Sequence, residues 1–263
     1  MEQVALVDEK SAGDIGRFYD KLSSDYDSMT SFESRCIRER PFLSLFVGRY
    51  KIRTALDAGA GTGVHSLLMA QQGVEVTAVD ISRKMLDKLK EHAQRLHLRI
   101  KTVKSGFQDL TDHIHDTFDA VLCTGNSLPH ITSRHELDRT LIGFFNLLNP
   151  EGVLFIQQLN YDRILATKEQ IQSVKESGNA TFVRYYEYHH DSILFNILKL
   201  MKGETGVKHS LESVTLRPIL KDELEEALRE AGFGDIKYFG SITLDAFQAR
   251  SSKDIVVMAR KPN

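Results

Sequence analysis

The chain has 263 residues, of which 41% are hydrophobic and 27% charged, as is ordinary for a globular protein with a large core. Its formal net charge is −2 at pH 7 with both signs scattered, which argues against nucleic acid as the main partner, because such binding needs a clustered basic surface. The start is too short and too acidic for a signal peptide, and no apolar run approaches a membrane span. We therefore expect a cytoplasmic protein with no membrane partner and no nucleic-acid partner.

The sequence contains two cysteines, Cys36 and Cys123, and neither has a metal-ligand neighbour. Two cysteines do not make a disulfide scaffold, and no group of histidine, cysteine and aspartate has the spacing of a metal site. We expect reduced thiols and no metal.

The N-terminal part predicts an arm followed by helices. Residues 1–13 have little periodicity and are expected to form a mobile arm. The segment 14–27 has a helical pattern with a break, and Tyr19 and Tyr26, seven residues apart, are expected to share one helix face. The two tyrosines either pack in the core or belong to a lid that closes over a ligand and excludes water.

A further helix is expected from about Arg38 to Tyr50, and Arg35 precedes it. The guanidinium fork of an arginine matches a carboxylate with two hydrogen bonds, so Arg35 is a candidate for binding a carboxylate of a ligand. A surface ion pair is the commoner role of an arginine.

The segment from Thr54 to Asp80 predicts a strand, a glycine-rich turn, a helix from about Val64 to Gln72, and a second strand that ends on an acid. Glycines let the backbone turn sharply and approach a ligand, and the following helix directs N–H groups and a positive dipole end toward it. Asp80, at the tip of the second strand, can accept both hydroxyls of a ribose. The turn supplies the candidate binding residues Asp57, Gly59, Ala60, Gly61 and Gly63.

This glycine spacing distinguishes between two classes of cofactor. The dinucleotide form is G-x-G-x-x-G, whereas here the third glycine comes one residue early and Val64 takes the sixth place. The spacing resembles the first motif of the class I S-adenosylmethionine-dependent methyltransferases. Asp80, followed by Ile81 and then Met85, is similar to their second motif, in which the acid takes the ribose hydroxyls and the next apolar residue lies against the adenine. The alternatives are a glycine turn that only packs a helix on a sheet, and a nicotinamide site.

The next elements are expected to be a helix at about 83–95, strands at 99–103, 118–123 and 153–156, a helix from about 133 to 148, and a turn at 149–152. By the resemblance, Gly106 and Phe107 cover the edge and face of the adenine, and Asp109 either contacts the base or caps a helix.

The tip of the strand at 118–123 is the second informative stretch. Small and amide side chains followed by proline and histidine predict a tight loop that faces the cofactor. Thr124 and Ser127 are its candidate cofactor contacts, and Asn126 and His130 are the candidate catalytic residues.

The organisation changes after Gln158. Three alternating runs at about 180–189, 192–201 and 206–216 predict an antiparallel meander. A helix from about 221 to 232 and an antiparallel pair at 235–239 and 254–260 then complete the main sheet. We therefore expect an α/β fold: a Rossmann-like seven-stranded sheet with helices on both faces and the meander inserted between strands 5 and 6.

The expected organisation is one structural unit with three parts. An N-terminal arm and lid helices take residues 1–50, the S-adenosylmethionine-binding part takes 51–160 and 217–263, and an inserted substrate lobe takes 161–216.

Four segments carry a closer likeness, at residues 32–35, 118–130, 149–154 and 160–165. They resemble the glycine/sarcosine N-methyltransferase group of the class I enzymes. The resemblance implies S-adenosylmethionine as methyl donor and S-adenosylhomocysteine as product. It also implies that Arg35 contacts the donor and that Asn126 positions the acceptor amine. A homo-oligomer is compatible with it, although the short N-terminal arm departs from the pattern of the family's tetramer.

One departure concerns the acceptor. The group places an arginine just before Asn160 to hold the substrate carboxylate, and this sequence has Leu159 there. Because an unpaired buried carboxylate is costly, either another cation replaces that arginine or the acceptor lacks the carboxylate. The replacement candidates are Arg163, Arg184 and Arg217.

The expected reaction is methyl transfer to a small-molecule amine by in-line displacement, with orientation as the main source of rate. His130 either relays the amine proton or only hydrogen-bonds the loop. Tyr185, Tyr186 and Tyr188 either line an acceptor pocket or pack the meander. The alternative functions are O- or C-methylation of a small molecule, and a non-catalytic S-adenosylmethionine-binding module.

Overall fold

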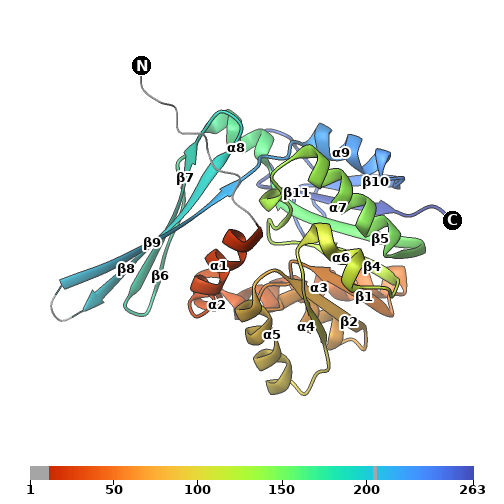
Figure 1. Cartoon of the computed structure of the whole chain (residues 1–263), viewed down its shortest axis with the longest axis horizontal. Helices are drawn as coiled ribbons and strands as arrows, with labels where there is room; N and C mark the ends of the chain where they lie inside the picture. The colour runs from red at the N-terminus through yellow and green to blue at the C-terminus, as the bar shows by residue number, and fades with distance from the viewer. Residues whose placement is uncertain (1–11, 204–205) are drawn as a thin grey trace.

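The computed structural model of the chain describes residues 12–203 and 206–263, and it contains two sheets (Figure 1). The larger sheet has seven strands in the order β10-β11-β5-β4-β1-β2-β3. The strands from β3 to β5 run parallel, and β11 and β10 are added antiparallel at one edge. Their bounds are β1 Thr54–Ala58, β2 Glu75–Asp80, β3 Lys101–Lys104, β4 Phe118–Cys123, β5 Leu148–Leu159, β10 Gly234–Phe239 and β11 Asp254–Arg260. The Rossmann-like fold with its reversed edge is confirmed.

Helices cover both faces of this sheet because its strands are apolar on both sides. In β1, Leu56 and Ala58 face one core cluster, whereas Ala55 faces the other. The first cluster receives apolar residues of α6 Leu110–His113, α7 Arg134–Asn146 and α9 Lys221–Glu230. The second receives those of α3 Phe32–Tyr50 and α4 Val64–Ala70, and α5 Arg83–Arg95 packs on β2 and β3.

The expected turn at 149–152 is not a break before the fifth strand. Strand β5 already begins at Leu148, which pairs with Phe118 of β4, and the pairing resumes only at Val153 with Ala120. The residues between form a bulge in which Glu151 has φ 61°. The turn-forming residues are therefore used inside a strand, where they shift its register.

The second sheet is the inserted one, and it has four antiparallel strands where three were expected. It extends away from the larger sheet and is drawn in cyan and blue-green in Figure 1. The additional strand is the edge strand β6, which pairs with β7. Helix α8 Tyr161–Thr167 leads into the sheet from β5. The strand bounds are β6 Ile171–Ser177, β7 Ala180–Tyr188, β8 Ile193–Gly203 and β9 Gly206–Leu216.

Two short N-terminal helices, α1 Ala12–Leu22 and α2 Tyr26–Thr30, lie between the two sheets. Their apolar residues share a core cluster with the inner face of the inserted sheet. Two ion pairs add to this contact, Lys21 with Glu212 at 2.9 Å and Lys199 with Asp25 at 2.7 Å.

The expected N-terminal arm lies largely outside the described residues, which begin at position 12, where α1 starts. Within the ranges 12–203 and 206–263, no helix combines the length and the apolar character needed to cross a membrane.

Candidate active site

A cavity of about 420 Å³ lies at the carboxyl ends of β1, β2 and β4, where a parallel α/β sheet normally binds its ligand. Most of the predicted cofactor contacts line it, from five separate parts of the chain. These are Tyr19, Tyr26, Arg35, Gly59, Ala60, Gly61, Gly63, Asp80, Ile81, Gly106, Phe107, Thr124 and Ser127.

Asp80 is held at the tip of β2 by two backbone donors. Gly61 N–H donates to its Oδ2 and Ser82 N–H donates to its Oδ1, both at 2.8 Å. Each carboxylate oxygen keeps capacity for a further hydrogen bond. The side chain is buried, and this burial raises the pKa of Asp80 to about 6. A ligand that donates hydroxyl groups here would stabilise the ionised form.

The glycines of the turn serve two different purposes. A Cβ at Gly59 would lie 2.7 Å from the Oγ of Ser127, so this glycine lets the loop after β4 approach the turn. At Gly63, with φ 96°, a Cβ would lie 2.6 Å from the Cγ of Leu89 in α5. The third glycine therefore permits close helix packing as well as the left-handed backbone conformation.

Two predicted cofactor contacts do not line the cavity. Asp57 is buried in β1 and accepts a hydrogen bond from the hydroxyl of Ser66 at 2.6 Å. Its Oδ1 is buried and has no partner among the described residues, and burial raises the pKa of this carboxyl. Met85 is 1% exposed and belongs to the core cluster beneath the inserted sheet. Asp57 therefore connects the buried end of β1 to the helix after the turn through Ser66, and Met85 is a packing residue.

At the adenine end predicted from the sequence, the structure supplies a polar side chain that the sequence did not indicate. The 3₁₀ turn η1 Phe107–Asp109 folds Gln108 back over Gly106. A Cβ at Gly106 would lie 3.1 Å from Gln108 Oε1, so the amide occupies the space that a side chain at Gly106 would fill. Asp109 does not line the cavity, and its side chain makes no capping hydrogen bond.

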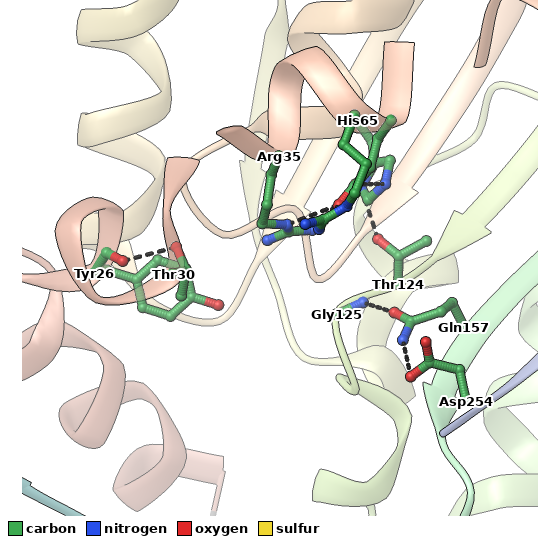
Figure 2. Close-up of polar contacts among 10 residues, drawn as sticks. Tyr26, Thr30, Arg35, His65, Thr124, Gly125, Gln157 and Asp254 are labelled. Atoms are coloured by element: carbon green, nitrogen blue, oxygen red, sulfur yellow. Dashed lines mark hydrogen bonds and ion pairs between the residues drawn. The ribbon is translucent and has the colours of Figure 1, made fainter. Parts of the chain in front are cut away.

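Arg35 belongs to a polar network that connects α3 to β4 (Figure 2). Its Nε donates to Glu39 Oε1 at 3.0 Å, and His65 Nε2 lies 3.0 Å from Glu39 Oε2. The Nδ1 of His65 lies 2.8 Å from the hydroxyl of Thr124. Burial alone would raise the pKa of Glu39, but its bonds to His65 and Arg35 outweigh burial and hold that pKa well below its usual range. The network thus fixes Arg35 and Thr124 relative to each other.

Tyr19 and Tyr26 meet in the cavity, although not by the expected route. They lie on two helices, α1 and α2, rather than on one helix face, and their ring centroids are 6.2 Å apart. The hydroxyl of Tyr19 lies 2.7 Å from Nε2 of His130, at the end of the turn η2 Leu128–His130. Burial lowers the pKa of His130 to about 4, and its Nδ1 has no partner within the described part of the chain. The imidazole is therefore neutral at physiological pH.

A second cavity, of about 730 Å³, lies between the larger sheet and the inserted sheet. It adjoins the first, because the two share the lining residues Tyr19, Tyr26, Arg35, His65, Gly125 and His130. Asn126 and Leu159 line this second cavity and not the first. Of the three tyrosines predicted on β7, only Tyr186 lines it, and Tyr186 also packs in the core.

Two amide side chains, those of Asn126 and Gln157, connect the loop after β4 to strand β5. Asn126, with φ 65°, accepts a hydrogen bond from Leu159 N–H at 2.9 Å and donates to the hydroxyl of Tyr161 at 2.9 Å. Gln157 accepts from Gly125 N–H at 2.7 Å and donates to Asp254 at 3.1 Å, as Figure 2 shows. The loop after β4 is thus tied to β5.

Sequence reasoning missed several lining residues of the first cavity, since nothing in their spacing distinguishes them from packing or capping residues. The signal for His65 was its place in the first turn of the helix after the glycines. The missed residues are Ile15, Thr62, Val64, His65, Ser105, Gln108, Gly125, Ile131, Thr132, Ser133 and Glu136.

Comparisons with known proteins agree with this geometry. A family model described as a methyltransferase domain matches residues 55–152. The chain is 31% identical over 220 residues to a glycine/sarcosine N-methyltransferase of Aphanothece halophytica, covering 82% of this chain and 79% of that protein. It is 38% identical over 213 residues to a cypemycin N-terminal methyltransferase of a Streptomyces species, covering 80% and 84%.

A solved S-adenosylmethionine-dependent methyltransferase from Clostridium acetobutylicum ATCC 824 has the same fold, with a TM-score of 0.80 at 15% identity. The alignment covers 93% of this chain and 99% of that one. With the cavity at the strand ends and the relatives above, the chain belongs to the class I S-adenosylmethionine-dependent methyltransferases, and its cofactor is S-adenosylmethionine.

Proposed function

We propose that this methyltransferase transfers the methyl group to the nitrogen of a small-molecule amine. The observation that carries the proposal is the pair of adjoining cavities, one at the strand ends of the larger sheet and one beneath the inserted sheet. The names of two similar proteins, both glycine/sarcosine N-methyltransferases, support nitrogen over oxygen or carbon.

The residues of the first cavity fit the methyl donor. Asp80 would accept the ribose hydroxyls, and Phe107 and Gln108 would contact the adenine. Arg35, held by Glu39, would bind the carboxylate of the methionine moiety. His130 lines this cavity, and its buried Nδ1 has no partner among the described residues, so it is free to bond a ligand.

The bound donor supplies an electrophilic methyl group on a sulfonium. The protein then has to hold an amine lone pair in line with that methyl, and positioning of this kind contributes on the order of 7–11 kcal/mol in favourable cases. The nitrogen–carbon bond forms as the carbon–sulfur bond breaks, the electron pair stays on sulfur, and the product ammonium later releases its proton. Tyr19 and His130 line both cavities, Asn126 lines the second, and the three would orient the amine.

His130 cannot serve in this scheme as a base with an ordinary histidine pKa. A histidine with a pKa of about 4 holds almost no proton at neutral pH, so it is a hydrogen-bonding group rather than a base that titrates near its ordinary pKa. The amine therefore has to react as its free base. A compound with a lower amine pKa is expected to react at lower pH than a strongly basic one.

The test is an assay of S-adenosylhomocysteine formation over matched amines, alcohols and thiols, with the methylated product identified by mass spectrometry. N-methylated products from amines, with no product from the corresponding alcohols, support the proposal. Methylation of the hydroxyl or thiol compounds in preference to the amines would overturn it.

A further inference from the structure

Two arginines line the second cavity without an acidic partner among the described residues. Arg184 on β7 lines it and donates from Nε to the hydroxyl of Ser173 at 2.7 Å. Arg163 on α8 lines it as well, and its buried Nε has no hydrogen-bond partner in the part of the chain that the structure describes. Within residues 12–203 and 206–263, neither arginine forms an ion pair. Burial lowers the pKa of Arg184, as expected for a guanidinium group that no carboxylate offsets.

The other charged side chains of this cavity are either bonded to a neighbour or exposed to solvent. Arg35 and Arg38 both pair with Glu39, at 3.0 and 3.1 Å. Asp254 accepts from Gln157, and the acid Glu169 and the cation Lys253, which also line the cavity, are both exposed to solvent. Consequently the partly buried guanidinium groups on the inserted sheet and α8 are left without a counterion in the described structure.

The third replacement candidate, Arg217, differs from these two. It pairs with Glu223 at the start of α9 and does not line the cavity. This arginine therefore has a structural partner and no access to an acceptor, which leaves Arg163 and Arg184.

We infer that the acceptor is an amine that also carries a carboxylate, and that Arg184, with Arg163 beside the same cavity, binds that carboxylate from the side of the inserted lobe. The inference rests on the proposed function and narrows its substrate class. A planar guanidinium binds a carboxylate through two charge-assisted hydrogen bonds, and such a partner removes the cost of leaving a cation buried and unpaired. Leu159, at the end of β5, cannot make this contact, so the lobe has taken over the role.

The volume of the second cavity indicates how long the acceptor is. Its volume of about 730 Å³ is in the range of sites for ligands much larger than glycine. An acceptor that places its amine at Asn126 and its carboxylate at the inserted sheet spans this cavity. We expect several bonds between the amine and the carboxylate, rather than the single carbon of glycine.

The experiment uses acceptors in matched pairs that differ only in charge. A series of ω-amino acids of increasing chain length, each with its primary amide, serves this purpose. Binding is measured by calorimetry on the full chain saturated with S-adenosylhomocysteine, and turnover by formation of S-adenosylhomocysteine from the donor. Arg184→Gln, Arg163→Gln and Arg184→Lys are compared with the wild type. Lys208→Gln is the matched control, because it removes a cation from an exposed site of β9 in the same sheet.

We expect at least one acid of the series to bind at least about tenfold more tightly than its amide, as a charge-assisted pair gives. Arg184→Gln should remove this preference, Arg163→Gln should reduce it, Arg184→Lys should retain part of it, and Lys208→Gln should leave it unchanged. Affinity for S-adenosylhomocysteine should be equal in all variants.

Three results would overturn the inference: equal binding of acids and amides, an acid preference that survives Arg184→Gln, or no binding of any acid. In each case, normal donor binding together with turnover of neutral amines would leave the proposed N-methylation intact. Loss of donor binding by the wild type would instead contradict the proposed function itself.

Discussion

Asp80 is the residue whose replacement has the most readily calculated effect on donor binding. Both of its carboxylate oxygens accept a backbone N–H at 2.8 Å and remain able to accept ribose hydroxyls. Hydrogen bonds to a charged group contribute about 1.5–3 kcal/mol each. The loss of two such bonds in Asp80→Ala is partly offset, because the ionised carboxylate no longer has to be kept buried. We expect a net loss of at least about 1.4 kcal/mol, which is a tenfold rise in the Kd of S-adenosylhomocysteine.

The pH dependence of donor affinity tests the same contact independently. In the free protein the pKa of Asp80 is about 6, and hydroxyl donors stabilise the ionised form, so the pKa falls when the donor binds. Below about pH 6 a proton must leave Asp80 on binding, and affinity should fall by up to about tenfold per pH unit. Above about pH 7 the carboxylate is already ionised, and affinity should level off. Asp80→Ala should lack this dependence.

The assay is isothermal titration calorimetry with S-adenosylhomocysteine, at about pH 8 and then at decreasing pH. Asp109→Ala is the control, since Asp109 follows Gln108 in sequence but does not line the cavity. Unchanged affinity in a folded Asp80→Ala variant, or a pH dependence that persists in it, would refute the assignment of Asp80 to the ribose.

Three further predictions concern His130, the glycine turn and Leu159. The folded pKa of His130, about 4, lies below its unfolded value of about 6.5, so its contribution to stability is present above pH 6.5 and is lost as the pH falls toward 4. In denaturant titrations, the free energy of unfolding of His130→Gln should therefore fall less steeply with acid than that of the wild type. An equal fall in both proteins would contradict the neutral imidazole. Gly63→Ala should lower the free energy of unfolding by about 1–3 kcal/mol more than Gly73→Ala. Both glycines have positive φ, but only a Cβ at Gly63 would clash with Leu89. Equal melting temperatures of the two variants would refute the role of Gly63 in helix packing. Leu159→Arg should raise kcat/KM for glycine at least about tenfold, measured by S-adenosylhomocysteine formation, and no gain would mean that the acceptor cavity differs from that of glycine enzymes in more than this residue.

The parts of the fold that were predicted correctly are those specified by local sequence. Helix α5 was expected at 83–95 and is observed at Arg83–Arg95, with Ser82 accepting a capping hydrogen bond from Met85 N–H. Strand β4 was expected and observed at 118–123, because it is a short segment of mostly buried apolar residues. In both cases the deciding signals, a cap with helical periodicity and a short, mostly apolar segment, lie within the element itself.

The errors in the fold come from signals that lie in another element. Strand β6 was missed because its sequence, from Ile171 to Ser177, is half exposed at the edge of a sheet and alternates weakly. The bulge at 149–152 was taken for a turn because its shape depends on pairing with β4, which the sequence of the segment does not show. Edge position and register are properties of the assembled sheet.

The residues of the cavity also divide into those that local sequence indicates and those whose position depends on another element. Asp80 and the glycine turn were found because the ends of parallel strands meet at one edge of a sheet. Met85 was predicted as a cofactor contact, but it packs in the core beneath the inserted sheet and does not line the cavity. Gln108 was missed because only the 3₁₀ turn brings its amide back over Gly106.

The most direct test of the account is a reaction that follows the methyl group itself. S-adenosylmethionine with an isotopically labelled methyl group is incubated with the full chain and the series of carboxylate-bearing amines, and the products are examined by nuclear magnetic resonance. We predict label on the nitrogen of an acceptor, in an amount equal to the S-adenosylhomocysteine formed, and loss of this transfer in Asp80→Ala. Label on oxygen or carbon, or tight donor binding with no transfer to any amine, would contradict the account.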